Sequence, residues 1–365
     1  MKVGIVGLPN VGKSTIFNAL TASDIPANNY PFCTIEPNVG IVQVPDNRLQ
    51  TINNFISTNK IIPTIIEFVD IAGLVKGASS GEGLGNKFLS HISNVDAIIH
   101  VVRGFHDDDI THVEGGINPI RDIQIIETEL LLKDLERLNK RKLKIQKQAK
   151  SQDKTAKIEN ELLDKAIEHL NNGNLLHNFG ANEIENKIIK SWFLLTNKPM
   201  IYLCNVSEES LQESKLNTVL HQVQEYANNH HIKCLQLCGN IEMELSKITD
   251  QNDKKDLLEL YNLNEPGLHK LIRLAYDQLG LITFFTAGEQ EIRAWTIIKD
   301  TRAPSAAGTI HSDFERGFIK AEIYNINDLI KFESENSLRD NGKVRQEGKE
   351  YVVQDGDIIF FKFNV

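Results

Sequence analysis

The sequence predicts an α/β fold in which a mostly parallel sheet forms one domain, an antiparallel helical arm is inserted into it, and a smaller domain follows. Three observations predict this arrangement: short apolar strands alternate with helical patterns, long helical repeats interrupt that alternation, and the last part becomes strand-rich. The expected ranges are 1–125 with 197–280 for the first domain, 126–196 for the arm and 281–365 for the last domain.

The first domain is expected to contain short strands joined by helices. Apolar runs predict strands at residues 3–6, 40–44, 64–70, 97–102, 200–204 and 234–237. A helical stretch at 211–228 separates the last two. Alternation of this kind predicts parallel strands covered by helices on both faces of the sheet.

The arm is predicted from apolar residues at helical spacing. Leu131, Leu135 and Leu138 recur at i, i+4 and i+7, which indicates one buried helical face. Two long helices should pair as an antiparallel coiled coil joined near residues 151–153, and a shorter helix should return to the sheet. Residues 133–157 carry ten Lys or Arg against three Asp or Glu, in a chain of net charge −9. This segment is either a solvated helix face or an electrostatic footprint for RNA.

The C-terminal part combines a helix with several strands. A helix is expected from residue 267 to about 279. Strands are expected at 284–285, 293–298, 317–324, 351–353 and 358–363. We therefore expect a separate small mixed α/β domain from about residue 281.

Length and composition are those of an ordinary soluble protein. The 365 residues are 41% hydrophobic, but no apolar run approaches the roughly 18 residues of a membrane span. Met1 and Lys2 lead directly into the first strand, so we expect no signal peptide, no membrane association and a cytoplasmic location. The four cysteines, which are Cys33, Cys204, Cys234 and Cys238, lack the paired spacing of a zinc site.

A phosphate-binding loop follows the first strand. Residues 7–15 read GLPNVGKST, which fits G-x-x-x-x-G-K-[ST], and a helical pattern begins directly after them. In such a loop the backbone N–H groups surround the α- and β-phosphates, Lys13 reaches the β- and γ-phosphate oxygens, and the Ser14 hydroxyl ligates Mg²⁺. The loop residues expected to contact the nucleotide are Asn10, Val11, Gly12, Lys13, Ser14 and Thr15.

A second phosphate-facing motif ends the strand at 64–70. Residues 70–73 read DIAG, which matches the D-x-x-G found after a P-loop. Asp70 is expected to hold Mg²⁺, usually through water, and the Gly73 N–H to bond the γ-phosphate. Thr34, in the loop at 30–38, is the candidate second hydroxyl ligand of the metal.

The residue after Gly73 departs from ordinary GTPases. Leu74 stands where small GTPases carry the glutamine that positions the attacking water, and leucine has no hydrogen-bonding group. Either hydrolysis is very slow or another polar group supplies the contact. The loop at 103–118 offers His106 and His112 for this role.

The base-selecting motif also differs. Residues 205–208 read NVSE where GTPases have N-K-x-D after a late strand. Val206 removes the lysine that packs over the base, and Glu208 places its carboxylate one methylene too far for the guanine N–H groups. Each lost hydrogen bond lowers guanine selectivity by roughly 1 to 3 kcal/mol, so adenine becomes the favoured base unless the segment is merely a strand-end turn.

Taken together, these motifs resemble the Obg-like ATPases, also called the YchF family, within the translation-factor-related P-loop NTPases. The resemblance covers essentially the whole chain, including PFCTIEPN at 31–38, FVDIAGLVKGASSGEGLGNKFL at 68–89 and FFTAGEQEIRAWTI at 284–297. It implies ATP hydrolysis, an inserted helical arm, a C-terminal TGS domain of β-grasp type and association with ribosomes.

The resemblance also implies roles for single residues. His112 matches the histidine that orients water, so Lys13, Gly73 and His112 are the expected catalytic residues. Asn205, the Val206 main chain and Glu208 are expected at the base, with residues 238–240 forming the other lip of that site. Asn10 stands where related cation-dependent NTPases bind K⁺, which suggests stimulation by potassium.

The resulting expectation is a monomeric Mg²⁺-dependent ATPase that acts as a ribosome-associated switch. The basic arm and the TGS domain would contact the large subunit or the whole ribosome, through rRNA or tRNA. Two alternatives stay open: a nucleotide-gated sensor with negligible turnover, and a GTPase with an unusual base loop.

Overall fold

The computed structural model describes residues 1–22, 38–71, 83–106, 116–149, 154–212 and 218–364. The chain forms two compact units, and each is discontinuous in sequence. The first comprises Met1–Val42 and Glu67–Leu271, and the second comprises Gln43–Ile66 and Ile272–Val365. This division differs from the ranges expected from the sequence, because residues 43–66 belong with the C-terminal part and not with residues 1–125.

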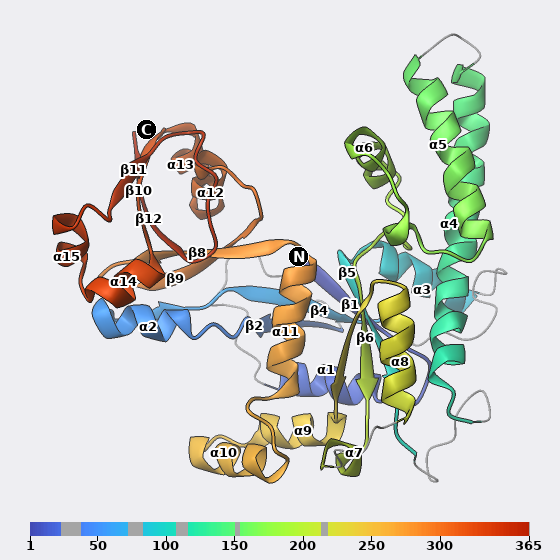
Figure 1. The fold of residues 1–365 in the computed structure, drawn as a ribbon, viewed down its shortest axis with the longest axis horizontal. Helices are drawn as coiled ribbons and strands as arrows, with labels where there is room; N and C mark the ends of the chain where they lie inside the picture. The colour runs from blue at the N-terminus through green and yellow to red at the C-terminus, as the bar shows by residue number, and fades with distance from the viewer. Residues whose placement is uncertain (23–37, 72–82, 107–115, 150–153, 213–217, 365) are drawn as a thin grey trace. The chain divides into compact units, whose positions relative to one another are not determined.

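The first unit is built on a six-stranded sheet (Figure 1). Its strands, in the order β2-β4-β1-β5-β6-β7, are β2 (Val39–Gln43), β4 (Ile65–Asp70), β1 (Lys2–Val6), β5 (Ala97–Arg103), β6 (Met200–Asn205) and β7 (Lys233–Leu237). The pairs β1/β4, β1/β5, β5/β6 and β6/β7 are all parallel, which confirms the mostly parallel sheet. Every residue of β5 and β6 is buried, as expected for central strands covered on both faces.

Helices connect the strands of this sheet. They are α1 (Lys13–Thr21), α3 (Gly83–Ser93), α7 (Glu208–Gln212), α8 (Thr218–Asn229), α9 (Gly239–Lys247) and α10 (Gln251–Leu260). Helix α11 (Gly267–Gln278) then leads from the first unit into the second. The helical stretch expected at 211–228 contains the end of α7 and most of α8, and residues 213–217 lie outside the described residues.

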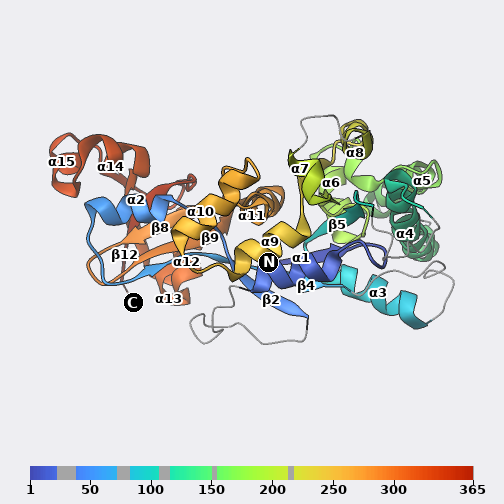
Figure 2. The ribbon, with the colours of Figure 1, turned by 90° about the horizontal axis from the view of Figure 1, so that it is seen from below.

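The arm consists of α4 (Pro119–Ala149), α5 (Lys154–Asn171), the short 3-10 helix η3 (Leu176–Asn178) and α6 (Glu183–Ser191). Figures 1 and 2 both place α5 directly beside α4. Leu138 on α4 and Leu162 on α5 are buried, and ion pairs join Arg141 to Glu159 and Lys142 to Asp164. Helix α4 begins before the arm's expected start at 126, because its first turns pack against β5.

Buried carboxylates fasten the base of the arm. Asp134 on α4 is fully buried and accepts hydrogen bonds from the Leu195 and Thr196 backbone N–H groups, at 3.0 and 2.8 Å, and from the Thr196 hydroxyl. Glu127, on the same helix, accepts from the hydroxyls of Tyr202 and Tyr226. Burial raises the pKa of both carboxyl groups, so their partners are needed to keep a charge there.

The second unit has its own six-stranded sheet in the order β11-β10-β12-β8-β9-β3. The strands are β3 (Ile61–Ile62), β8 (Leu281–Ala287), β9 (Ile292–Ile298), β10 (Phe318–Asn325), β11 (Arg345–Glu347) and β12 (Asp357–Phe363), and the helices are α2 (Arg48–Phe55), α12 (Ala303–Ile310), α13 (Ser312–Arg316), α14 (Ile326–Phe332) and α15 (Glu335–Asp340). The β8/β9 hairpin is antiparallel and β12 runs parallel to β8, the β-grasp arrangement. The strand expected at 351–353 is wrong: Val352 makes a single bridge to Arg302.

Residues 43–66 complete the core of this second unit. Leu49 and Ile52 of α2 are buried in one cluster with Phe285 and Tyr324, and β3 pairs with β9. A second apolar cluster, which contains Phe284, covers the opposite face of the sheet, since neighbouring strand residues point to opposite faces. Among the described helices of both units, none is long and apolar enough to cross a membrane.

Candidate nucleotide-binding site

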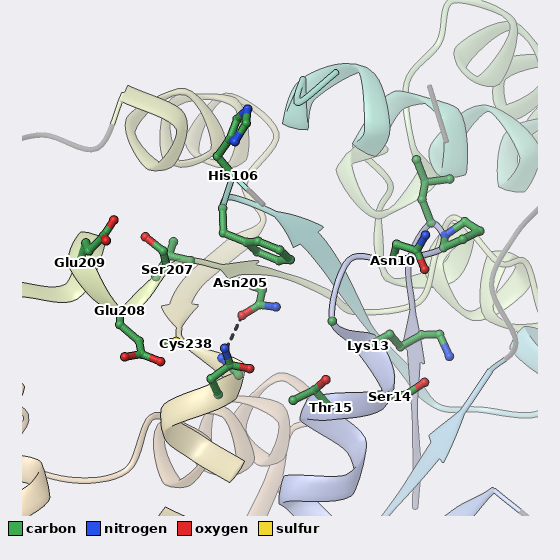
Figure 3. A pocket seen from close by; sticks show the side chains of 17 residues that line it. Asn10, Lys13, Ser14, Thr15, His106, Asn205, Ser207, Glu208, Glu209 and Cys238 are labelled. Atoms are coloured by element: carbon green, nitrogen blue, oxygen red, sulfur yellow. Dashed lines mark hydrogen bonds between the residues drawn. The ribbon is translucent and has the colours of Figure 1, made fainter. Parts of the chain in front are cut away.

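A pocket of about 1000 Å³ lies in the first unit, where β1, β5, β6 and β7 end (Figure 3). The carboxyl edge of a parallel sheet is where α/β proteins place their ligands. The residues that line the pocket are Leu8, Pro9, Asn10, Gly12, Lys13, Ser14, Thr15, Phe105, His106, Asn205, Val206, Ser207, Glu208, Glu209, Cys238, Gly239 and Asn240. The predicted phosphate loop and the predicted base segment therefore share one pocket.

The phosphate loop bends where left-handed backbone is required. Gly12, which caps α1, has φ +90°, and Asn10 has φ +64°. A Cβ atom on Gly12 would lie 2.1 Å from Asn205 Nδ2, so glycine is needed for both its φ angle and the close approach. Val11 is buried and does not line the pocket, so its contribution is through its main chain.

Lys13 and Asp70 are brought together by the parallel pairing of β1 and β4. Ile5 is paired with Asp70 in the register, so the phosphate loop and the D-x-x-G aspartate leave the sheet at the same edge. The Lys13 ammonium forms an ion pair with the Asp70 carboxylate. This contact places the predicted phosphate-binding cation next to the predicted metal-binding carboxylate.

The donor set at this end fits a hard divalent cation. The Ser14 hydroxyl lines the pocket in the first turn of α1, one residue after Lys13 and next to Thr15. Hydroxyl and carboxylate oxygens, completed by water and phosphate oxygens, are the ligands that Mg²⁺ prefers. Ser14 and Asp70 would therefore hold the ion on the protein side.

Asn205 joins the two ends of the pocket. Its amide donates from Nδ2 to the Val11 carbonyl at 3.0 Å, and its Oδ1 accepts from the Gly239 N–H at 2.9 Å. Figure 3 shows Asn205 between Lys13 on one side and Glu208 on the other. The side chain is 5% exposed, and one N–H and one lone pair are left to meet a base.

The other predicted base residues are placed as follows. Val206 is buried and donates its N–H to the Leu237 carbonyl at 2.9 Å, so its own carbonyl is the main-chain group left for a base. Glu208 lines the pocket, and its Oε2 accepts from the Tyr261 hydroxyl at 3.2 Å. Burial raises the pKa of the Cys238 thiol, so that lip of the pocket is uncharged.

Sequence reasoning missed Phe105 as a pocket residue. Phe105 follows β5 and is held by the buried Arg103. The Arg103 guanidinium lies 4.6 Å from the Phe105 ring centroid and donates to the Phe105 carbonyl at 3.1 Å. His106, the next residue, also lines the pocket and is exposed. Their position two and three residues after a central parallel strand is the signal that would have found them.

Three residues expected in catalysis or metal binding, Thr34, Gly73 and His112, lie outside the described residues. Leu74, which stands in place of the usual glutamine, lies outside them as well. Their assignments stay predictions. The rest of the expected site, from Asn10 to Thr15 with Asp70, Asn205, Val206 and Glu208, is described.

Comparisons with known proteins agree with this geometry. A family model described as a 50S ribosome-binding GTPase matches residues 2–206, and the YchF-GTPase_C model, described as a protein of unknown function, matches residues 281–364. The Bacillus subtilis protein named Ribosome-binding ATPase YchF is 50% identical over 365 residues, which is all of both chains. Its namesake from Escherichia coli O157:H7 is 46% identical over all of this chain and 99% of its own.

A solved structure also matches the whole chain. The structure titled as the Schizosaccharomyces pombe YchF GTPase is 39% identical, covers 99% of this chain and 97% of its own, and superposes with a TM-score of 0.89. The names of these relatives differ in the nucleotide, since the two bacterial proteins are called ATPases and the yeast structure is called a GTPase. Because relatives up to 50% identical match the whole chain, and the two family models match residues 2–206 and 281–364, the chain belongs to the YchF family of P-loop NTPases.

Proposed function

We propose that this protein is a Mg²⁺-dependent ATPase that prefers ATP to GTP and works as a ribosome-associated switch in the cytoplasm. One observation carries the proposal: a single pocket holds both the phosphate loop with Lys13 and the segment 205–208, in which the guanine-reading residues are replaced. The curated relatives are named ribosome-binding ATPases, which supports the same conclusion.

The phosphate end supplies charge stabilisation. Transfer of a γ-phosphoryl group needs positive charge and N–H donors around its oxygens more than it needs covalent chemistry. Lys13 and the loop backbone provide them, and Ser14 with Asp70 would hold Mg²⁺, which neutralises charge on the β- and γ-phosphates when bound. Release of Lys13 from Asp70 would free its ammonium for the phosphate.

The base end favours adenine. A guanine base presents two N–H donors that an aspartate at position 208 would accept, and Glu208 is turned toward Tyr261. Asn205 can still offer an N–H to the base, and the Val206 carbonyl can accept from an exocyclic amine, which adenine carries.

The proposal also gives a role to each of two single residues, His112 and Asn10. His112 orients the attacking water in place of glutamine, because Leu74 has no hydrogen-bonding group. Asn10 supports K⁺ near the phosphates.

The test is phosphate release from ATP and from GTP, measured with purified protein at equal Mg²⁺, with and without ribosomes. Faster release from ATP supports the proposal, and a clear preference for GTP contradicts the base argument. No release from ATP in either condition favours the nucleotide-gated sensor instead.

Two further measurements address the finer roles. His112→Ala should lower turnover at least tenfold with little change in ATP affinity. His221→Ala, at an exposed histidine of α8 that does not line the pocket, is the control and should leave turnover unchanged. Unchanged turnover in His112→Ala removes the assignment. Equal rates in KCl and NaCl would remove the role of K⁺.

Ribosome binding is tested on the arm. Arg141 and Lys142 pair within the arm, so Lys144 and Lys147, both exposed, are the better residues to reverse. Lys144→Glu with Lys147→Glu should weaken co-sedimentation with ribosomes most at low salt, whereas Lys254→Glu with Lys255→Glu on α10 should not. Equal binding by both double variants would make the basic segment a solvated face.

A further inference from the structure

Phe193 is an exposed aromatic residue in an otherwise buried turn of the first unit. It follows α6, and 78% of its surface is accessible. Its neighbours Trp192, Leu194, Leu195 and Thr196 are all buried. A turn that buries four of five consecutive side chains leaves its phenyl ring in solvent.

The backbone of Phe193 is also unfavourable. Its φ of +51° lies in the left-handed region, which bulky residues rarely adopt and which glycine or asparagine would occupy without strain. The left-handed backbone opposes folding, and the exposed ring gains almost no burial energy to offset it. Neither feature is explained by packing within the described residues of the chain.

The turn is held rigidly despite that strain. Arg137 on α4 donates to the Phe193 carbonyl, the Trp192 indole donates to Glu159 at 3.0 Å, and Asp134 accepts from the two residues that follow Leu194. These contacts come from both long helices of the arm. These contacts fix the backbone on either side of the ring, as the precise placement of a binding group requires.

The turn and the helix segments that hold it carry excess positive charge. The cationic residues of these segments are Lys133, Arg137, Lys140, Arg141 and Lys190, and the acidic ones are Asp134, Glu136 and Glu159. Arg137 donates to the Phe193 carbonyl, and the Phe193 N–H donates to the Lys190 carbonyl. Asp134 is buried, Glu136 is bound by Lys133 and Lys140, and Glu159 is bound by Arg141 and the Trp192 indole. Lys190 is exposed in the last turn of α6, next to the ring.

We propose that Phe193 stacks on an unpaired nucleobase of ribosomal RNA, while Arg137 and Lys190 attract the adjoining phosphates. Every base offers a π-face, and aromatic rings among Lys and Arg are how single-stranded RNA is held. A protein partner would instead call for an apolar surround that excludes water, but Lys190 and Ser191 beside the ring are exposed and polar. This inference rests on the ribosome association proposed above.

The first test is quantitative co-sedimentation with ribosomes at fixed salt. Phe193→Ala should weaken binding between about 5-fold and 100-fold, the range for one lost stacking contact. Phe193→Tyr and Phe193→Trp should bind as tightly as the wild type, whereas Phe193→Leu, which keeps apolar area without a π-face, should behave like Phe193→Ala. Ile184→Ala, at another exposed apolar residue on α6, is the matched control and should bind normally.

Folding can be separated from binding in the same series. Because the left-handed backbone suits asparagine, Phe193→Asn should unfold at the wild-type temperature or above it, yet bind ribosomes as weakly as Phe193→Ala. Weak binding in a variant that is as stable as the wild type excludes damage to the fold. Normal binding by Phe193→Asn overturns the inference.

The second test identifies what the ring touches. The photoreactive analogue p-benzoylphenylalanine is placed at position 193, or at position 184 as the control, and irradiated on ribosomes. An adduct at 193 that ribonuclease removes supports the inference, and an adduct to a ribosomal protein, or no adduct from bound protein, overturns it. If the wild-type protein does not sediment with ribosomes at all, the proposed function fails first, before position 193 is tested.

Discussion

The two ends of the nucleotide pocket are built in different ways. The lining of the phosphate end comes from one short run, residues 8–15, whose conformation depends on Gly12 and on the helix that follows. The base end is assembled from segments after β5, β6 and β7, and the Asn205 amide bonds the phosphate loop to the last of these. The residues of a contiguous site can be identified from their spacing in the sequence. The residues of an assembled site can be brought together only when the order of the strands is known.

The two ends of the pocket are also expected to have different chemical tasks. The phosphate end makes contacts that any nucleoside triphosphate can satisfy, whereas the base end decides which nucleotide is used. Variants at the junction should therefore damage both properties, and variants at the base end should change selectivity with little loss of turnover.

The largest effect is expected at the junction, from Gly12→Ala. Alanine at this position would have to adopt a left-handed backbone, and its Cβ atom would lie 2.1 Å from Asn205 Nδ2. We expect the free energy of unfolding to fall by about 2 to 4 kcal/mol and nucleotide affinity to fall at least about 100-fold. Urea unfolding and a nucleotide titration measure the two losses.

Gly173→Ala is the matched control. Gly173 has φ +79°, but an added Cβ would meet nothing within 4 Å. Its substitution should cost about 1 kcal/mol of backbone strain and leave nucleotide affinity unchanged. Equal effects at Gly12 and Gly173 would mean that the contact with Asn205 is unimportant.

Asn205→Ala should give the next largest effect. Removing the amide leaves the Val11 carbonyl and the Gly239 N–H without a partner at a buried position, so affinity for ATP and for GTP should both fall by about 10-fold to 100-fold. Asn205→Asp keeps the acceptor for Gly239 but sets a carboxylate against the Val11 carbonyl, and should be no better. A loss confined to one nucleotide would show that Asn205 reads the base and does not join the two ends.

A smaller, selective effect is expected at the base end from Glu208→Asp. Shortening the side chain by one methylene restores the carboxylate position that guanine reading uses, so the ratio of GTP to ATP affinity should rise by about 5-fold to 10-fold. Glu209→Asp, at the next pocket-lining residue, is the control and should leave the ratio unchanged. Competition titrations with the two nucleotides measure the ratio of GTP to ATP affinity. Equal ratios in both variants would contradict the assignment of Glu208 to base selection.

The smallest effect concerns β5, which ends between the two halves of the pocket. Burial lowers the pKa of His100 from 6.5 to about 3, and among the described residues its Nδ1 has no hydrogen-bond partner. Between these values the unfolded chain binds the proton and the folded protein does not, so stability is lost as the pH falls below about 6.5. The slope is at most about 1.4 kcal/mol per pH unit.

His100→Phe should remove that slope. The ring packs edge-on against Tyr202 at 5.8 Å, a geometry that phenylalanine can keep. Urea unfolding at pH 7 and pH 5.5 should show a smaller difference in the variant than in the wild type. If the difference is unchanged, the loss of stability at low pH originates from groups other than His100. Titratable groups at the two ends of the pocket are then the first to test.

Much of the fold followed from local patterns in the sequence. The phosphate loop, the central strands and the arm were predictable because glycine spacing, apolar runs and helical repeats are properties of neighbouring residues. The ion pair of Lys13 with Asp70 was not predicted, because it depends on β1 and β4 being parallel neighbours in the sheet.

Other features depended on contacts distant in sequence. The role of Asn205 as a brace and the exposure of Glu208 beside Tyr261 arise only when three strands have been placed in order. The apolar residues of 43–66 recur at helical spacing and then in short apolar pairs, as in many α/β connections, so nothing in their own pattern assigns Leu49 and Ile52 to the core around Phe285.

The divided second unit has a consequence for synthesis of the chain. Residues 43–66 emerge about 200 residues before Ile272, which at roughly 5 to 20 residues per second is a wait of about 10 to 40 seconds. During that time Leu49 and Ile52 have no apolar partners from the C-terminal strands. A fragment that begins at residue 281 would have the converse defect, since Phe285 and Tyr324 would lack the helix that covers them. The first unit can be completed once residue 271 has been made, whereas the second, although its first segment is made early, has to wait for the last strands of the chain.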